Sequence, residues 1–301
     1  KSINNIVDAA NYILFDLGHP MHTFDLSKIH NSKIIVKRAS EDKKVLCLDG
    51  LERSVTKDHL LICDDIKPLA IAGIMGLESS SVKNDTRDIL IESAYFNPIT
   101  IRKGAKLLDL STDASKRFER DTDIDSIIYS LDTLAGLIQE IAGGEVCDNL
   151  VDVYPNEVEI RKINFSFNDC NSLLGTSLDE STMLDILNKL SISSKENKGI
   201  TECSIPSYRN DLERPVDLYE EIARVFGYDN IPVSETFSAS YLSMIPDKHL
   251  VSKNISNILS MNGFNEHFSN SLLSSEQINL FSKGIDVEIG NPLSSDMQFL
   301  R

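Results

Sequence analysis

Residues 88–107 read DILIESAYFNPITIRKGAKL, and this stretch decides the fold class that we expect for the chain. Its first part, Asp88–Ala94, is rich in apolar residues and is typical of a strand. Asn97 then precedes Pro98, which is the order of an N-cap followed by proline in the first turn of a helix, and we expect that helix to end near Leu107. A strand followed closely by a capped helix predicts a mixed α+β fold.

The sequence before this stretch predicts short strands, and helices are expected on both sides of it. An apolar stripe at helical spacing indicates a helix over residues 4–17, and another indicates a helix over residues 123–142. Turn signals such as Asp49-Gly50 separate the strand-like runs, and residues 18–22 are expected to form a loop. The expected strands are Ile34–Lys37, Lys44–Leu48, His59–Cys63 and Leu69–Gly73.

A second module is expected from about residue 158 to residue 233, in the order strand, helix, helix, strand, helix. Its helices are predicted over residues 179–190 and 213–226, with a polar loop over residues 193–199 and a short strand over residues 202–205. A tail follows, with a helix over residues 248–261 and strand-like pieces after it.

The length and composition indicate a globular chain of several domains. At 301 residues the chain is too long for one ordinary core, and its 41% hydrophobic and 25% charged residues are ordinary. No run of about 18 apolar residues is present, and the start has no signal-peptide layout, so no membrane partner is expected. The first residue is not Met and the end carries no obvious stop, so we expect both ends to be cuts in a longer chain.

The cysteines and the net charge bound the function classes further. The five cysteines are scattered and never form a C-x-x-C pair, which fits neither a zinc site nor a disulfide framework and favours a reducing cytoplasm. The net charge of −16 argues against sequence-independent nucleic-acid binding by this chain alone. Any nucleic-acid contact should therefore be local or be supplied by a partner.

His22 and Glu92 are the first candidate site residues. A histidine after a Gly-His-Pro turn can orient water or a carbonyl near neutral pH, although it could equally bond a backbone group in a loop. Glu92 stands in an apolar strand, where a buried carboxyl is costly unless it is paired. The alternative is that Glu92 points into water, but Leu90 and Ala94 on the same strand face argue against it.

Two further segments could shape a site. Gly73 and Gly76 follow an expected strand and would allow close approach of a ligand to the backbone. The run from Thr112 to Arg120 begins with small hydroxyl residues, and it can also be explained as a helix start with Thr112 or Asp113 as N-cap.

An acidic cluster opens the last helix of the second module. Its carboxylates at helical spacing could hold a hard cation such as Mg²⁺. They could equally be acidic residues that the helix dipole favours in a first turn. The members are Asp211, Asp217, Glu220 and Glu221.

These stretches, taken in order, resemble the β subunit of bacterial phenylalanyl-tRNA synthetase over essentially the whole chain. Residues 18–25, GHPMHTFD, are similar to the family's GQPMHAFD, and Asn11-Tyr12 stands before them as in the family. The other matching segments are Leu48–Gly50, Gly73–Gly76, Glu92, Thr112–Arg120, Ser207–Arg209, Gly227–Pro232, Asn291–Ser294 and Leu300-Arg301.

The resemblance implies an α+β multidomain fold of three parts. Residues 1–153 would form a mixed α/β editing domain that hydrolyses tyrosine wrongly attached to tRNA(Phe). Residues 154–234 would form a small winged-helix-like α/β module, and residues 235–301 the start of an inactive, antiparallel domain like a class II synthetase core. The implied assembly is an (αβ)₂ heterotetramer in which the α subunit uses ATP to charge tRNA(Phe) with phenylalanine.

The resemblance also implies roles for particular residues. The editing residues carried over by position are His22, Asn11, Glu92, Thr112 and Ala114, with Gly73, Gly76 and Glu92 binding the substrate. His22, with Asn11 nearby, would position the ester or the attacking water. Mg²⁺ shared with the α subunit would be held by Asp211, Asp217, Glu220 and Glu221.

Three departures from the family pattern leave a second interpretation open. Leu77 stands where the family has the second of two glycines, Asp121 stands where it has a glycine after the run that ends in Arg120, and residues 107–109 replace its Arg-His-Gly. The alternative function is a structural scaffold that supports the α subunit and tRNA, with weakened editing.

Overall fold

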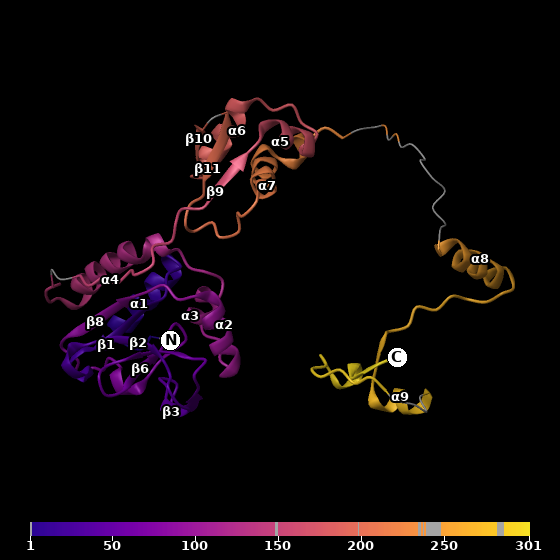
Figure 1. Cartoon of the computed structure of the whole chain (residues 1–301). Coiled ribbons are helices and arrows are strands. Elements are labelled where there is room, and N and C mark those ends of the chain that lie inside the picture. Colours follow the sequence, from indigo (N-terminus) through magenta and orange to yellow (C-terminus); the bar gives the residue numbers. More distant parts are fainter. Residues whose placement is uncertain are drawn as a thin grey trace. The chain divides into compact units, whose positions relative to one another are not determined.

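The chain mixes helices with antiparallel strands in two compact units. The computed structural model describes residues 2–147, 150–197, 199–233, 236, 238, 248–281 and 286–301. The units are Lys1–Val233 and Ser234–Arg301 (Figure 1). Every pairing between named strands in the described residues is antiparallel, which agrees with the mixed fold class expected.

A ribbon of two strands lies at the centre of the N-terminal part. Strand β1 (Met21–Asp25) pairs with β8 (Ile89–Ser93), although the two are far apart in sequence. Helices α1 (Asn5–Asp16) and α4 (Ile127–Ala142) lie beside this ribbon in Figure 1. Their buried residues form one core with the ribbon residues that point toward them, namely Ala9, Ala10, Ile13, Leu134 and Ile138 with Met21, Ile89 and Ile91.

The other face of the ribbon belongs to a second and larger core. A four-stranded sheet runs in the order β2 (Ile35–Arg38), β5 (Leu60–Cys63), β6 (Pro68–Ile71), β7 (Met75–Gly76), and β3 (Lys43–Leu46) pairs with β4 (Glu52–Val55). Helices α2 (Pro98–Leu107) and α3 (Asp113–Phe118) add their buried side chains to this core. Phe24, Leu69, Ile71, Ile101 and Phe118 are among its members.

Local sequence signals placed the helix starts of this part correctly. The Asn97 side chain accepts a hydrogen bond from the backbone N–H of Thr100, so Asn97 is the N-cap of α2 as predicted. The helix expected over residues 123–142 begins as a short 3₁₀ turn, Ile124–Ser126, and continues as α4. Both starts lie within the one or two residues by which helix boundaries ordinarily vary.

The second module has its own sheet and its own core. Its elements are β9 (Lys162–Phe165), α5 (Phe167–Leu174), α6 (Glu180–Lys189), β10 (Ser193–Asn197), β11 (Ile200–Ser204) and α7 (Pro215–Phe226), with sheet order β10-β11-β9. The core includes Ile163, Met183, Leu187, Leu218 and Ile222. The prediction of a polar loop over residues 193–199 is wrong, because residues 193–197 form strand β10. This strand lies at the edge of the sheet, where most of its side chains are exposed and need not be apolar.

The second unit contains short elements. Helix α8 (Lys248–Met261) has the bounds expected for it, and α9 (Ser275–Phe281) and the pair β12 (Leu272–Leu273) and β13 (Phe299–Leu300) follow. The predicted boundary between residues 234 and 235 lies outside the described residues, and the three-part division stays a prediction. In the described ranges, no helix combines the length and apolar character needed to cross a membrane.

Candidate functional site

The strand ribbon brings His22 and Glu92 opposite each other. They are direct partners in the antiparallel register of β1 and β8, so their side chains lie on the same face. This face also carries Phe24 and Leu90, which pack into the larger core. The prediction of a loop is wrong at His22. From Met21 onward the chain is a β-strand, because it pairs with the distant strand β8.

Glu92 carries a buried oxygen without a hydrogen-bond partner. Its residue as a whole is half-buried, but the Oε2 atom is inaccessible and unpaired within the described residues. Because Leu90 and Ala94 on the same face pack against the core, the alternative that Glu92 points into water does not hold. A buried acceptor without a partner costs free energy, and such groups are typically kept for a ligand or for chemistry.

Burial keeps both members of the pair uncharged at neutral pH. Desolvation raises the pKa of Glu92 to about 8 and lowers the pKa of His22 to about 4. The His22 and Phe24 rings pack nearly perpendicular to each other, with 4.5 Å between their centroids. An unprotonated imidazole therefore faces a protonated carboxyl across the ribbon.

Gly76 lets the His22 ring lie directly against the backbone of β7. A Cβ atom at this position would stand 2.6 Å from His22 Cε1 and 2.7 Å from Leu48 Cδ1. Gly73 has a left-handed φ of +64°, and a Cβ there would meet Phe96 and Ile101 at 2.8 and 2.9 Å. Both predicted glycines are thus required by the packing, and Gly76 is the one that borders His22.

Thr112 ties helix α3 to this glycine turn. Thr112 is the N-cap of α3 and forms a capping box with Ser115. Of the two N-caps expected, Thr112 and Asp113, the first is confirmed. The Thr112 hydroxyl also donates to the backbone carbonyl of Ile74, at 2.9 Å. Ala114, in the first turn of α3, is half-buried and packs against the larger core. These two residues therefore hold α3 next to the turn that borders His22.

The structure does not bring Asn11 to His22. Asn11 is exposed on α1, and α1 packs on the face of the ribbon opposite to His22. The buried side of this helix is lined by Ala10, Ile13 and Leu14, and position 11 lies outside that stripe. The expectation that Asn11 stands beside His22 is therefore not met, and its assigned role stays a prediction.

The departures from the family pattern have structural explanations. Asp109 and Asp121 stand where the family has glycine, and both adopt left-handed φ angles, +47° and +74°. Aspartate is one of the few residues that tolerate this region. Leu77 has an extended backbone, and its side chain is buried in the larger core. None of the three substitutions removes a group from the face that carries His22.

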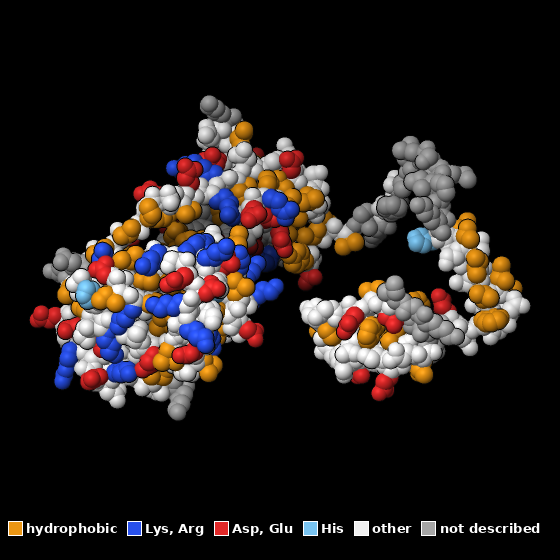
Figure 2. Space-filling view, turned by 60° about the horizontal axis from the view of Figure 1, so that its bottom comes forward, with side chains coloured by type: hydrophobic (Ala, Val, Ile, Leu, Met, Phe, Trp, Pro, Cys, Tyr) orange, Lys and Arg blue, Asp and Glu red, His pale blue; other side chains and the backbone are white. Residues whose placement is uncertain are grey.

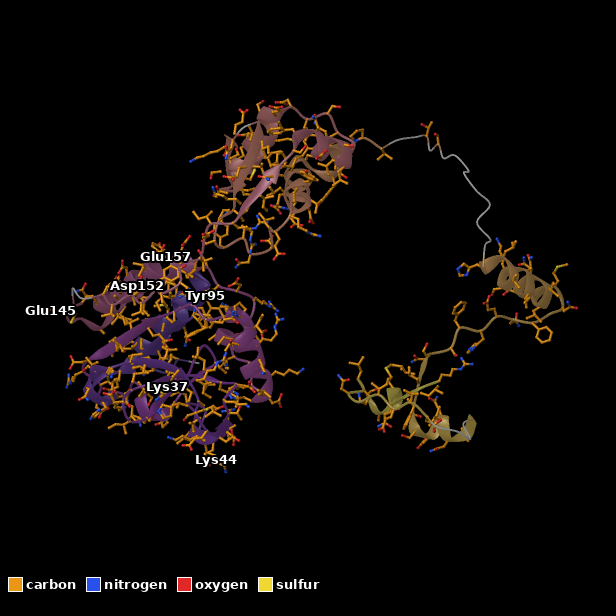
Figure 3. The ribbon with its side chains drawn as sticks, viewed as in Figure 1. Lys37, Lys44, Tyr95, Glu145, Asp152 and Glu157 are labelled. Carbon is orange, nitrogen blue, oxygen red and sulfur yellow. The ribbon has the colours of Figure 1, made fainter. Side chains whose placement is uncertain are left out.

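His19 and Tyr95 were missed as parts of this region. His19 is buried between the hydroxyls of Ser93 and Ser126, and desolvation lowers its pKa to about 4. Tyr95, labelled in Figure 3, has its pKa raised to about 12 by burial and by a hydrogen bond to Asp121. His19 could have been suspected from its place in the Gly-His-Pro turn, whereas nothing in the sequence marks the partner of Tyr95.

The acidic cluster of the second module does not converge on one point. Asp217 accepts hydrogen bonds from the backbone of Glu213 and Arg214 at the start of α7. Asp211 pairs with Arg209, and Glu221 lies between Arg209 and Arg224.

Glu220, the remaining member, is exposed on α7. No group of three metal-ligating side chains occurs in the ranges that the structure describes. The four carboxylates of this cluster therefore do not by themselves fit a magnesium site. Their arginine and backbone partners match the alternative of an acidic helix start.

Three family models match successive parts of the chain. They are the B3/4 domain over residues 1–143, the tRNA synthetase B5 domain over residues 163–228 and the phenylalanyl tRNA synthetase beta chain CLM domain over residues 231–301. This succession places the chain in the class of aminoacyl-tRNA synthetase subunits.

Relatives identify the family within that class. The chain is 39% identical over 311 residues to the phenylalanine–tRNA ligase beta subunit of Syntrophus aciditrophicus, and 40% identical over 314 residues to that of Syntrophotalea carbinolica. Each match covers 100% of this chain and 39% of the relative. The chain belongs to the family of bacterial phenylalanine–tRNA ligase beta subunits and spans about two fifths of the length of these relatives.

A solved structure is also similar to this chain. It is an N-terminal fragment of the phenylalanyl-tRNA synthetase beta-subunit from Pyrococcus horikoshii, matched over 74% of this chain and 65% of that chain at 16% identity. The TM-score of this match is 0.37.

Proposed function

We propose that the N-terminal part hydrolyses the ester bond between tyrosine and tRNA(Phe), as the editing site of a phenylalanine–tRNA ligase. The observation that carries the proposal is the unpaired, buried Oε2 of Glu92, which lies opposite His22 on the same face of the ribbon. The site offers one buried polar group in otherwise apolar surroundings, and tyrosine brings one hydroxyl.

The selectivity follows from the hydroxyl that distinguishes tyrosine from phenylalanine. The carboxyl of Glu92 can hydrogen-bond the phenolic O–H, which ends the unpaired state of Oε2. A phenyl ring in the same position would leave that oxygen buried and unpaired, and would displace any water from it. Sites that hydrogen-bond a substrate hydroxyl can reject the analogue that lacks it by about 10⁴-fold or more.

His22 supplies a neutral imidazole for the hydrolytic step. A ring nitrogen can accept a hydrogen bond from the attacking water or orient the ester carbonyl. The water oxygen forms the new bond to the carbonyl carbon, the ester C–O bond breaks, and the ribose oxygen leaves with a proton. The terminal hydroxyls of the tRNA can assist this proton transfer. Because the pKa of His22 is about 4, its ring is unprotonated at neutral pH, and one ring nitrogen can accept a hydrogen bond from the water.

The remaining parts support assembly with the α subunit. Helix α8 leaves Leu250, Val251, Ile255, Ile258 and Leu259 exposed. Hydrophobic side chains, drawn in orange, are visible on the surface of the C-terminal unit in Figure 2. Such exposed apolar surface is typical of a protein interface. We propose that it contributes to an (αβ)₂ heterotetramer in the cytoplasm whose α subunit holds the ATP and Mg²⁺ used to charge tRNA(Phe). A pure scaffold is the second candidate function, and this apolar surface is the observation that favours it.

The test is deacylation of Tyr-tRNA(Phe) and Phe-tRNA(Phe) by the purified chain in excess. We expect selective loss of tyrosine. Glu92→Ala should lower the ratio of the two rates at least about tenfold, because the polar group that discriminates between them is removed. His22→Ala should slow both reactions on the order of 10²-fold.

Two comparisons make the result decisive. Glu52→Gln removes an exposed strand carboxylate on β4 and should change neither rate. Circular dichroism of each variant checks the fold. Equal deacylation of both charged tRNAs by the unmutated chain would refute the editing proposal, and no hydrolysis by the complete αβ enzyme would favour the scaffold.

A further inference from the structure

Basic side chains are concentrated on two neighbouring helices of an otherwise acidic chain. Helix α2 packs against α3, and the side chains in question are exposed or half-buried. We refer to this set as the α2–α3 basic surface: Arg102, Lys103, Lys106, Lys116, Arg117 and Arg120. Residues 97–120 carry these six Lys and Arg against Asp109, Asp113 and Glu119, whereas the whole chain carries 30 Lys and Arg against 46 Asp and Glu. Lys and Arg side chains are numerous on the N-terminal face in view in Figure 2.

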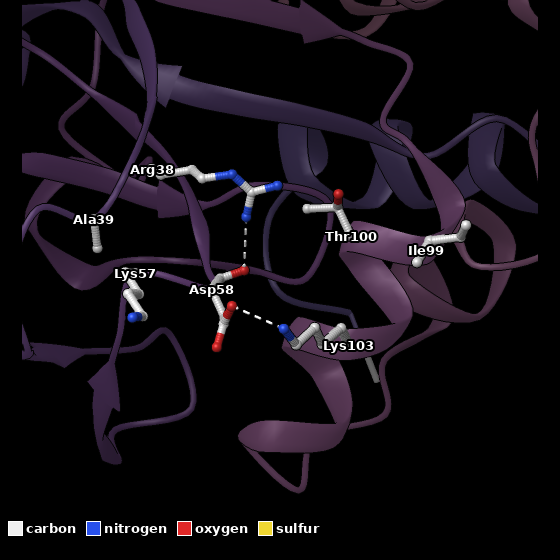
Figure 4. A pocket seen from close by; sticks show the side chains of 7 residues that line it. All are labelled: Arg38, Ala39, Lys57, Asp58, Ile99, Thr100 and Lys103. Atoms are coloured by element: carbon white, nitrogen blue, oxygen red, sulfur yellow. Dashed lines mark hydrogen bonds and ion pairs between the residues drawn. The ribbon is translucent and has the colours of Figure 1, made fainter.

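One end of the surface borders a hollow that holds more cations than carboxylates. Its lining is Arg38, Ala39, Lys57, Asp58, Ile99, Thr100 and Lys103 (Figure 4). The Asp58 carboxylate pairs with Lys103 at 2.9 Å, and Arg38 donates to the uncharged backbone carbonyl of Asp58 at 3.2 Å. The charges of Arg38 and Lys57 are therefore not balanced by the single carboxylate of this hollow.

The other end borders a second hollow beside α1. Its lining is Gly18, Lys116, Arg117, Arg120, Asp121, Thr122 and Asp123. Both of its carboxylates have internal partners. Asp121 accepts a hydrogen bond from the hydroxyl of Tyr95, and Asp123 accepts one from the backbone N–H of Asp125. The three cations project from the helix that Thr112 anchors to the glycine turn at the candidate site, and from the turn that follows it.

Two exposed aromatic rings lie on α1, and one of them contacts a cation that lines this second hollow. The guanidinium of Arg117 stands over the ring of Phe15, 5.2 Å from its centroid. Phe15 is 67% exposed and Tyr12, on the same helix, is 58% exposed. Aromatic side chains so exposed on α1 add little to its packing, and a guanidinium stacked on an aromatic ring is a common platform for a nucleic-acid base.

We infer that the α2–α3 basic surface, with Phe15 and Tyr12 at its end, binds the phosphate backbone and the unpaired terminal bases of an RNA. The cations match the phosphates, and the rings match bases that are free to unstack, which only a single-stranded segment offers. The inference rests on the proposed function in one respect: a tRNA supplies both a duplex stem and a single-stranded 3′ end next to the aminoacyl ester.

The surface positions the RNA and does not carry out the chemistry. Every cation named is outside the ribbon face that holds His22 and Glu92, so binding and hydrolysis can be separated by mutation. Lys103 and Lys106 on α2 are suitable for charge reversal because both are exposed. Lys43 and Lys44 on β3 are exposed lysines that line neither hollow and together provide the matched control; Lys44 is labelled in Figure 3.

The experiment measures binding of uncharged tRNA(Phe) transcript to the 301-residue chain at several salt concentrations, by fluorescence anisotropy. We expect Lys103→Glu with Lys106→Glu to weaken binding at least about tenfold at low salt. The slope of log K against log salt should fall by about 0.7–0.9 for each phosphate that the variant no longer neutralises. Lys43→Glu with Lys44→Glu, which changes the net charge by the same amount, should leave both quantities unchanged.

A second arm tests the aromatic platform. Phe15→Leu keeps an apolar side chain but removes the ring. It should weaken binding of the transcript on the order of tenfold, and should not affect a blunt RNA duplex. Phe15→Tyr should retain binding. Equally weakened binding of transcript and blunt duplex would overturn the role of the ring.

A third arm separates this inference from the proposed function. Hydrolysis of a tyrosyl ester of adenosine, which has no phosphate backbone, should be equal in the wild type and in the charge-reversed variant. If the chain hydrolyses this ester but binds tRNA no worse after charge reversal, the inference is wrong and editing stands. If the surface binds tRNA as expected but no ester is hydrolysed, the inference stands and the editing proposal fails. A chain that binds no RNA overturns the inference.

Discussion

At the scale of single residues, the candidate site depends on two ionisable groups that are kept uncharged. Glu92 holds a proton and His22 lacks one because burial disfavours the charge on each. A fully paired carboxylate would already have its hydrogen bonds and could not gain by binding tyrosine. The unpaired oxygen of Glu92 therefore costs stability and at the same time provides the polar group on which the proposed selectivity for tyrosine depends.

The pKa of Glu92 predicts a specific dependence of stability on pH. The ordinary pKa of a glutamate is 4.5, and the folded value is about 8. Between these values the native state binds more protons than the unfolded state, so this contribution to stability is present below pH 4.5 and is lost as the pH rises through 8. His22 acts in the opposite sense, because its folded pKa of about 4 lies below 6.5 and stability falls as the pH drops through that window.

Glu92→Gln should remove only the first effect. We expect the variant to match the wild type at about pH 4 and to be more stable by about 1–3 kcal/mol at about pH 8.5, since an amide need not ionise. Urea unfolding at both pH values measures this. Glu52→Gln, on the exposed face of β4, serves as the reference. A stability difference that does not change with pH would mean that Glu92 ionises normally in the folded chain.

At the scale of elements, the site depends on how closely β7 approaches β1. Gly76 has no side chain, and the His22 ring occupies the space where a Cβ would be. Gly76→Ala should therefore shift His22, lower the free energy of unfolding by about 1–3 kcal/mol and slow deacylation more than about tenfold. Thermal unfolding and single-turnover hydrolysis would measure the two effects.

A second glycine provides the control. Gly136 lies inside α4, and a Cβ there would meet nothing within 4 Å. Gly136→Ala should stabilise the chain by about 0.5–1 kcal/mol, because alanine is the better helix former, and should not change hydrolysis. Unchanged hydrolysis by Gly76→Ala would show that the close approach of β7 to His22 is not needed for editing.

At the scale of the whole molecule, the N-terminal part and the second module are each stabilised by their own hydrophobic cores. The cores of the N-terminal part share no residue with the core of the second module. Leu187 is fully buried in the second module, and Leu134 is fully buried between α1 and α4. Each Leu→Ala change should cost about 2–5 kcal/mol through the cavity that it leaves.

We expect each destabilisation to stay within its own part. Hydrogen exchange should show reduced amide protection over residues 161–231 in Leu187→Ala and over residues 5–142 in Leu134→Ala. The two variants control for each other, because each removes the same side-chain atoms. Equally reduced protection in both parts from either change would show that they unfold as one cooperative unit.

The sequence by itself determined the local elements and their chemistry. Asn97-Pro98 and Thr112 predicted helix starts because an N-cap depends only on residues three positions away. The bounds of α2 and α8 and the strand character of residues 89–93 also followed from local composition and periodicity. His22, Glu92, Thr112 and the two glycines were selected from sequence and from the family resemblance.

Only the tertiary structure decided what these residues contact. Residues 21–25 form a strand because β8 pairs with them from far along the chain, and a polar run became β10 because it lies at a sheet edge. The exclusion of Asn11 from the His22 face, and the internal partners of the acidic cluster, depend on packing between elements. Such contacts join residues that are distant in sequence, so no local pattern carries them, and burial alone set the protonation of Glu92 and His22.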